Sequence, residues 1–128
     1  MPNYNTNIYK THDDEVICYY KWEGIGPRKG RGVIQIAHGE GEHAGRYERI
    51  ANRLSQEGFT IYANDHRAHG KTAEIKRLYG YYDGENYFED AVEDMHVLSE
   101  LIRSEHPKKP LILFGHSMGS LLSRKYVL

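Results

Sequence analysis

The sequence feature that most constrains the fold is the pentapeptide Gly115-His116-Ser117-Met118-Gly119, which follows the apolar run 111–114 and precedes an apolar-periodic segment. A G-x-S-x-G sequence between a strand and a helix is typical of a nucleophile elbow, a turn too tight for large residues beside the serine. Such a turn presents the serine hydroxyl at the edge of a sheet, with the N–H of Met118 directed toward a developing oxyanion. The pattern predicts Ser117 as a nucleophile, and an ordinary glycine-rich turn is the alternative.

The residues after the elbow contain neither an acid nor a histidine. In the fold that uses this elbow, the acid and the histidine of a catalytic triad follow the serine along the chain. Residues 120–128 also lack the usual helix-stop residues glycine, asparagine and proline. We therefore expect a chain that is cut inside a helix and that has no ordinary esterase turnover by itself.

Composition bounds the class of protein. A length of 128 residues allows one domain or part of one, and a net charge of −1 gives no reason to expect nucleic acid as a partner. The single cysteine, Cys18, lies in an alternating stretch and is expected to be a buried structural thiol. The N-terminus has no signal-peptide pattern and no run reaches membrane-spanning length, so we expect a cytoplasmic protein without an integral membrane segment.

Strand and helix patterns alternate after a short hairpin. The predicted elements are strands over 8–11, 16–20, 33–37, 60–63 and 111–114, and helices over 47–54 and 88–102. Gly58 and Pro107 supply helix stops, and a Gly- and Tyr-rich connection precedes the second helix. The alternation predicts an α/β fold with a hairpin start and then a mostly parallel sheet with helices on both faces.

The last strand and helix are expected to lack cover. If the chain is cut inside the following helix, strand 111–114 is expected to lose a neighbouring strand and to become an apolar edge of the sheet. The following helix is expected to expose Leu121, Leu122 and Val127. On the preceding helix, one apolar face is predicted: Phe88, Ala91, Met95, Leu98 and Ile102. We therefore expect self-association through the exposed sheet edge, or a partner chain.

Three separated blocks carry a family resemblance: HGEGEHAGRY at 38–47, DHRAHGKT at 65–72 and GHSMG at 115–119. Together and in this order, they make the chain resemble the N-terminal half of an α/β-hydrolase of the monoacylglycerol lipase and lysophospholipase group, which are serine aminopeptidase S33-like hydrolases. By this resemblance, residues 1–128 are one half of a single domain whose cap and C-terminal strands are absent. The complete protein would be a serine carboxylic-ester hydrolase of lipid-like monoesters, with no cofactor and no metal.

The resemblance also implies roles at the site. A loop with glycines on both sides of one residue can turn that residue's N–H toward the elbow, and Glu40 occupies this position. The backbone N–H groups of Glu40 and Met118 would then form the oxyanion hole. The family usually has an uncharged residue at position 40, so the Glu40 carboxylate must point outward or its pKa must rise. Three further residues fall where relatives hold the alcohol part of a glycerol ester: Glu42, Arg46 and His116. A loop ion pair and a space-filling histidine are the alternative for these three.

The second block has a mainly structural interpretation. Asp65 is expected to accept backbone N–H groups of the following loop, and Arg67 to pair with nearby carboxylates. Ala68 stands where the family normally has glycine, and a positive φ there would cost about 1 kcal/mol. Four histidines lie in the first two blocks: His38, His43, His66 and His69. Because no further ligands occur at metal-binding spacing, we expect loop histidines with hydrogen-bond partners and no metal.

Two other classes of function remain open. The strand at 33–37, the glycine-rich loop 39–45 and a later strand ending in Asp65 mimic a dinucleotide-binding unit. However, the glycine spacing differs from G-x-G-x-x-G, two glutamates would face the pyrophosphate, and the elbow at Ser117 would be unexplained. The third possibility is a non-catalytic truncated or split-gene product that needs a partner, such as its C-terminal half.

Overall fold

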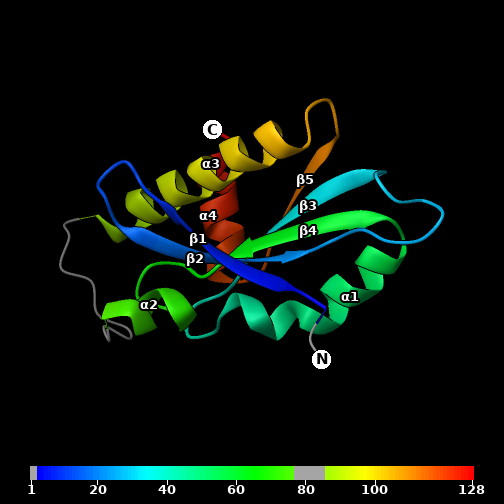
Figure 1. Cartoon of the computed structure of the whole chain (residues 1–128). Helices are drawn as coiled ribbons and strands as arrows, with labels where there is room; N and C mark the ends of the chain where they lie inside the picture. Colours follow the sequence, from blue (N-terminus) through cyan, green and yellow to red (C-terminus); the bar gives the residue numbers. More distant parts are fainter. Residues whose placement is uncertain (1–2, 77–85) are drawn as a thin grey trace.

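The computed structural model describes residues 3–76 and 86–128 and builds them around a five-stranded sheet (Figure 1). The strands are β1 (Asn5–Lys10), β2 (Val16–Trp22), β3 (Gly32–Ala37), β4 (Phe59–Asn64) and β5 (Leu111–Gly115). They lie in the order β1-β2-β4-β3-β5. β2 is antiparallel to β1 and β4, whereas β3 is parallel to both β4 and β5. The predicted hairpin start and the parallel continuation are therefore confirmed.

Helices cover both faces of this sheet. They are α1 (Glu48–Gln56), α2 (Gly70–Lys76), α3 (Tyr87–Glu105) and α4 (Met118–Tyr126), and a short 3-10 helix (Ala44–Tyr47) precedes α1. Figure 1 shows α3 and α4 on one face and α1 on the other. The sequence did not predict α2, because seven residues are too few for an apolar repeat to show. The Gly- and Tyr-rich connection at 77–85 lies outside the described residues.

The two faces of the sheet use alternate residues of the same strands, as the two-residue period of a strand requires. One cluster packs strand residues against α1: Tyr20, Trp22, Ile34, Ile36, Ile61 and Ala63, with Ala51 of the helix. A second packs the opposite face against α3: Tyr9, Ile17, Tyr19, Val33 and Tyr62, with Leu98 and Ile102. Each face of the sheet formed by β2, β3 and β4 is therefore covered by a separate apolar cluster, one with α1 and the other with α3.

A third cluster holds the last helix in place. It joins Ala37 of β3, Ala91, Val92 and Met95 of α3, and Leu122 of α4. The expectation that Leu122 would be exposed is wrong, because α3 and β3 together bury it completely. Phe88, predicted on the buried face of α3, is 36% exposed and lies outside these clusters.

β5 forms an open edge of the sheet, as expected. Ile112 and Phe114 are 47% and 41% exposed, and Leu121 and Val127 of α4 are more exposed still. The part of α4 that faces away from α3 is therefore uncovered, while the part that faces α3 is packed.

Cys18 behaves as a structural residue. It is buried and free of any disulfide, its N–H donates to Thr72 Oγ1 at 2.9 Å, and burial raises the pKa of the thiol to about 11. Within residues 3–76 and 86–128, no helix has the length and apolar character needed to cross a membrane.

Candidate active site

The turn between β5 and α4 has the geometry that the pentapeptide predicts. Ser117 is exposed and has φ 54° and ψ −121°, a conformation that residues with a side chain rarely adopt. A Cβ on Gly119 would lie 1.9 Å from the carbonyl oxygen of Ala37, and one on Gly115 would lie 2.5 Å from that of Gly119. Both distances are far below van der Waals contact, which confirms that only glycine fits on either side of the serine.

The loop after β3 lies directly against this turn. A Cβ on Gly39 would be 3.1 Å from the Cβ of Ser117, so the backbone of the loop reaches the serine. Glu40, the next residue, has an exposed side chain, as an outward-pointing carboxylate requires. Met118 is the first residue of α4, and its N–H therefore has no intrahelical acceptor. The structure thus brings the loop containing Glu40 and the amide of Met118 to the same place as Ser117.

Glu42 supports this loop from within. Its Oε1 accepts the N–H of Gly39 at 3.0 Å and a short hydrogen bond from the hydroxyl of Tyr47. Burial alone would raise the pKa of Glu42, but these two hydrogen bonds lower it below its ordinary value. Arg46 and His116 are exposed, and none of the ion pairs among the described residues joins Glu42 to Arg46. Tyr47 was not predicted as a residue of the site, because its helical spacing with Ile50, Ala51 and Leu54 indicated only a core position.

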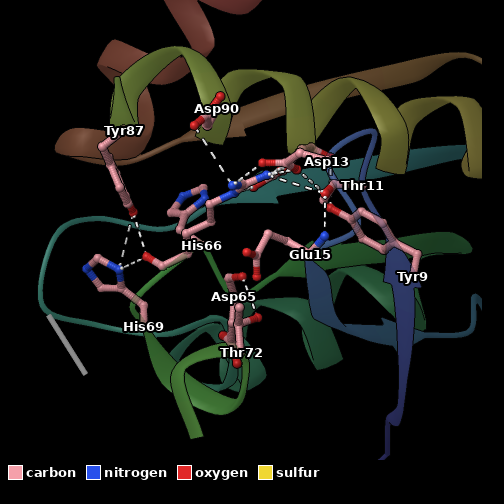
Figure 2. A network of polar contacts seen from close by, with 12 residues as sticks. Tyr9, Thr11, Asp13, Glu15, Asp65, His66, His69, Thr72, Tyr87 and Asp90 are labelled. Atoms are coloured by element: carbon pink, nitrogen blue, oxygen red, sulfur yellow. Dashed lines mark hydrogen bonds and ion pairs between the residues drawn. The ribbon is translucent and has the colours of Figure 1, made fainter. Parts of the chain in front are cut away.

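Asp65 links the two loops that follow β3 and β4. Its carboxylate accepts the N–H of Lys71 at 2.8 Å, as predicted for the segment that follows, and also that of Ala44 at 2.7 Å from the earlier loop. The hydroxyl of Thr72 donates to the backbone carbonyl of Asp65 at 2.8 Å (Figure 2). Burial raises the pKa of Asp65 even though both backbone donors act to lower it. Ala68 in the same loop has φ 66°, so the strained conformation considered from the sequence is present.

Arg67 makes the carboxylate pairs that the sequence predicts, and it makes them across the molecule. Its guanidinium binds Asp94 of α3 through two hydrogen bonds of 2.7 and 2.9 Å. It also binds Asp13 in the β1–β2 turn at 2.7 and 2.9 Å, and Figure 2 shows this network between the hairpin and α3. Burial raises the pKa of Asp94 to about 6, against the lowering influence of Arg67. Neither partner was foreseen, because both are distant in sequence.

The histidines of the two loops differ in their surroundings. His38 and His66 are fully buried, with ring centroids 4.1 Å apart, whereas His43 is exposed. His69 is half-buried, and its Nδ1 lies 2.8 Å from the carbonyl oxygen of Arg67. In the described part of the chain, no group of three or more histidine, cysteine, aspartate or glutamate residues is arranged to hold a metal ion. The prediction of ordinary loop histidines missed the buried pair, which nothing in the local sequence distinguishes.

Comparison with known proteins agrees with this geometry. Residues 28–128 match the family model described as serine aminopeptidase, S33. The chain belongs to this hydrolase family. It is 42% identical over 89 residues to a monoacylglycerol lipase of Mycolicibacterium smegmatis, which covers 70% of this chain and 30% of the relative. It is 31% identical over 108 residues to the monoglyceride lipase of Rattus norvegicus, which covers 84% of this chain and 33% of that relative.

Solved structures show the same α/β-hydrolase fold. A thermostable carboxyl esterase from Bacillus coagulans, in complex with glycerol, matches with a TM-score of 0.87 at 31% identity, over 98% of this chain and 40% of the esterase. A soluble variant of monoglyceride lipase from Saccharomyces cerevisiae, in complex with a substrate analog, matches with a TM-score of 0.75 over 96% of this chain and 37% of the lipase; at 24% identity it supports the fold alone. The chain spans 30% and 33% of the length of the two curated relatives described above. Family membership also accounts for the elbow at Ser117, which the dinucleotide-binding alternative left unexplained.

Proposed function

We propose that Ser117 is the nucleophile of a serine hydrolase that cleaves carboxylic esters of lipid-like monoacyl compounds, a monoacylglycerol or a lysophospholipid. The observation that carries this proposal is the exposed serine in its strained turn, packed against the Gly39 backbone and at the start of α4. The names of the two curated relatives described above support a monoacylglycerol as the substrate. In this proposal, residues 1–128 form the N-terminal half of one α/β-hydrolase domain.

The proposed reaction follows the usual course of serine esterases. Ser117 Oγ attacks the ester carbonyl carbon while a general base removes its proton. The N–H groups of Glu40 and Met118 stabilise the negative charge on the carbonyl oxygen, the alcohol leaves with a proton, and water then hydrolyses the acyl-enzyme. Among residues 3–76 and 86–128, no histidine donates to or accepts from the Ser117 hydroxyl in the hydrogen bonds of the structure. The base and its orienting acid therefore come, in this proposal, from residues outside these 128.

The alcohol part of the substrate is proposed to lie along Glu42, Arg46 and His116. Arg46 and His116 are exposed and free to turn toward a glycerol hydroxyl. Among the described residues, the two hydrogen bonds to Glu42 both use Oε1, which leaves Oε2 as an acceptor for the substrate in this proposal. Glu42 would thus support the loop and contact the substrate with different oxygens.

A second candidate is a non-catalytic chain that needs a partner. The exposed apolar residues of β5 favour it, because an open apolar edge is a surface on which further strands pair. The partner would be the C-terminal half of the domain or a second copy of this chain.

Complementation tests the catalytic proposal. Residues 1–128 would be co-expressed with the C-terminal part of the Mycolicibacterium smegmatis relative, purified as a complex, and treated with a fluorophosphonate and with a short p-nitrophenyl ester. We expect ester turnover by the complex and labelling of Ser117, with both lost in Ser117→Ala. The isolated chain is expected to lack this turnover. A complex that forms but whose Ser117 remains unlabelled would show that the catalytic proposal is wrong.

A further inference from the structure

Two buried histidines connect the end of β4 to the loop beside Ser117. The backbone N–H of His66 donates to Nε2 of His38 at 3.0 Å. In return, Nε2 of His66 lies 3.0 Å from the carbonyl oxygen of His38. The second ring nitrogen of His38, Nδ1, lies 2.7 Å from the carbonyl oxygen of Gly39. The pair thus makes three hydrogen bonds to the backbone of residues 38, 39 and 66.

These contacts assign the protons on both rings. Nε2 of His38 accepts from a backbone amide, so it carries no proton, and the proton on Nδ1 donates to the Gly39 carbonyl. A carbonyl oxygen only accepts, so Nε2 of His66 carries the proton that it donates to His38. Nδ1 of His66 is buried without a partner among the described residues, where a second proton would be costly. Both rings are therefore neutral, each in one tautomer.

The ring of His38 donates to the peptide group between Gly39 and Glu40, whose N–H is the proposed oxyanion donor. The carbonyl of Gly39 and the N–H of Glu40 belong to the same peptide unit, which is planar and trans, so they point in opposite directions. A ring that holds the Gly39 carbonyl therefore also fixes the direction of the Glu40 N–H. Glu42 holds the N–H of Gly39 at 3.0 Å, so the next peptide group toward β3 is fixed as well.

We propose that His38 is a positioning residue for the Glu40 N–H and that His66 holds His38 in the tautomer this requires. The inference rests on the proposed function, because Glu40 is an oxyanion donor only there. A hydrogen bond accepted by the Gly39 carbonyl also polarises its peptide group and makes the Glu40 N–H a better donor. Because both rings are buried and neutral, the support does not change with protonation in the ordinary range of a histidine. Burial lowers the pKa of His38 to about 4 and that of His66 well below its usual value.

The test uses two substitutions at one position and a remote control. His38→Leu removes the ring donor, whereas in His38→Asn the side-chain amide N–H can occupy the place of Nδ1–H and donate to Gly39. Ser99→Ala removes a buried hydroxyl of α3 that donates to Gln35 of β3 and contacts the hydroxyl of Tyr126, outside the loop at 38–42, and measures the effect of losing buried hydrogen bonds elsewhere. All variants would be prepared in the complemented complex described above, together with the parent.

Two measurements do not depend on activity. Nitrogen NMR of the parent is expected to show His38 with its proton on Nδ1 and His66 with its proton on Nε2, unchanged down to about pH 5, below the ordinary imidazole pKa. Hydrogen exchange of the Glu40 amide is expected to accelerate in His38→Leu, to recover in His38→Asn and to stay at the parent rate in Ser99→Ala. A proton on Nε2 of His38, or unchanged exchange in His38→Leu, would overturn the proposal.

Kinetics separate positioning from binding. In His38→Leu we expect kcat to fall roughly 100-fold with KM almost unchanged, because only the transition state uses the oxyanion donor. His38→Asn is expected to regain a large part of kcat, and Ser99→Ala to keep it. Equal losses in His38→Leu and Ser99→Ala would contradict a positioning role. If the parent complex shows no turnover that depends on Ser117, the proposed function fails, while the NMR and exchange results still decide whether the histidines fix the loop.

Discussion

The two edges of the sheet differ in how the chain closes them. At the β1 edge, the exposed side chains are mostly polar or charged: Asn5, Thr6, Asn7 and Lys10. The hydroxyl of Tyr9 donates to the carbonyl of Asp94 in α3 at 2.7 Å, and Arg67 ties the β1–β2 turn to the same helix. At the β5 edge, Ile112 and Phe114 face solvent. One edge is therefore anchored by long-range polar contacts, and the other presents apolar surface.

The polar contacts that anchor the sheet and the proposed nucleophile therefore belong to different edges of the sheet. Ser117 lies on the open side, where β5 and α4 are held by the cluster around Leu122 and by the close approach of Gly119 to Ala37. The loops that flank the serine are held from the anchored side, through Asp65, Arg67 and the histidine pair. We therefore expect substitutions on the anchored side to affect the free energy of unfolding, and substitutions on the open side to affect association.

The largest effect is expected at Arg67. Arg67→Met leaves Asp94 buried without its partner, so we expect the free energy of unfolding to fall by about 3–5 kcal/mol in urea titrations. Arg31→Met is the control, because Arg31 is an exposed cation 4.0 Å from Glu57, and the loss should stay below about 1 kcal/mol. Equal losses in the two variants would mean that the β1 edge is not anchored by the Arg67 network.

Acid should weaken the anchored side through His66. The folded protein keeps this histidine neutral because burial lowers its pKa well below the usual 6.5, whereas the unfolded chain takes up a proton there. The unfolded state then binds more protons, so the stabilising contribution present above about pH 6.5 is lost as pH falls. By about pH 5 the loss is roughly 2 kcal/mol.

His66→Gln isolates this contribution, since the glutamine does not titrate and its amide can donate to His38 in place of Nε2. The stability difference between the parent and His66→Gln should shift by that amount between about pH 7 and about pH 5 in urea titrations. His38, with its lowered pKa, and Asp94, whose pKa is raised and which therefore acts in the opposite direction, are present in both proteins and cancel in the difference. A difference independent of pH would show that His66 is not held neutral.

The elements of the fold could be predicted because their signals are local. The apolar and aromatic run of β2, the apolar spacing of α3 and the stops at Gly58 and Pro107 all act within a few residues. The exposure of Leu122 was predicted wrongly because it depends on which face of α4 meets α3, and that is set by the packing of elements far apart in sequence. Pattern alone shows that a helix face is apolar, but not what covers it.

The candidate site divides in the same way. The tight turn around Ser117 and the acceptor role of Asp65 follow from short motifs, and the structure contains both. The histidine pair could not be predicted, because His38 and His66 follow different strands and meet only where β3 and β4 lie side by side. The partners of Arg67 were missed for the same reason.

A smaller effect is expected at Ala68 on the anchored side. Ala68→Gly relieves about 1 kcal/mol of strain at φ 66°, but glycine adds freedom to the unfolded chain, so the net gain should be at most about 0.5 kcal/mol. Ala51→Gly in the buried part of α1 is the contrasting control, with an expected loss of about 1 kcal/mol or more. A loss in Ala68→Gly similar to that in Ala51→Gly would show that the loop does not need the left-handed conformation.

The smallest change in stability is expected when the same substitution is made on each edge. This pair of variants also tests the difference between the two edges most directly. Ile112 of β5 and Ile8 of β1 are 47% and 63% exposed, so replacing either with threonine should change the free energy of unfolding by no more than about 0.5 kcal/mol. Threonine keeps the branched shape that suits a strand, so each variant alters only the polarity of its edge.

Association should nevertheless respond at one edge only. We expect the isolated chain to self-associate through β5, and Ile112→Thr to lower the average mass measured by light scattering over a range of concentrations, whereas Ile8→Thr should leave that mass unchanged. The reason is that Ile8 is the only exposed apolar residue of β1, whereas Ile112 is followed by the exposed Phe114 on a strand whose outer edge has no neighbouring strand in the described sheet. An equal decrease in both variants, or a parent that remains monomeric at every concentration, would remove the distinction between an anchored and an open edge.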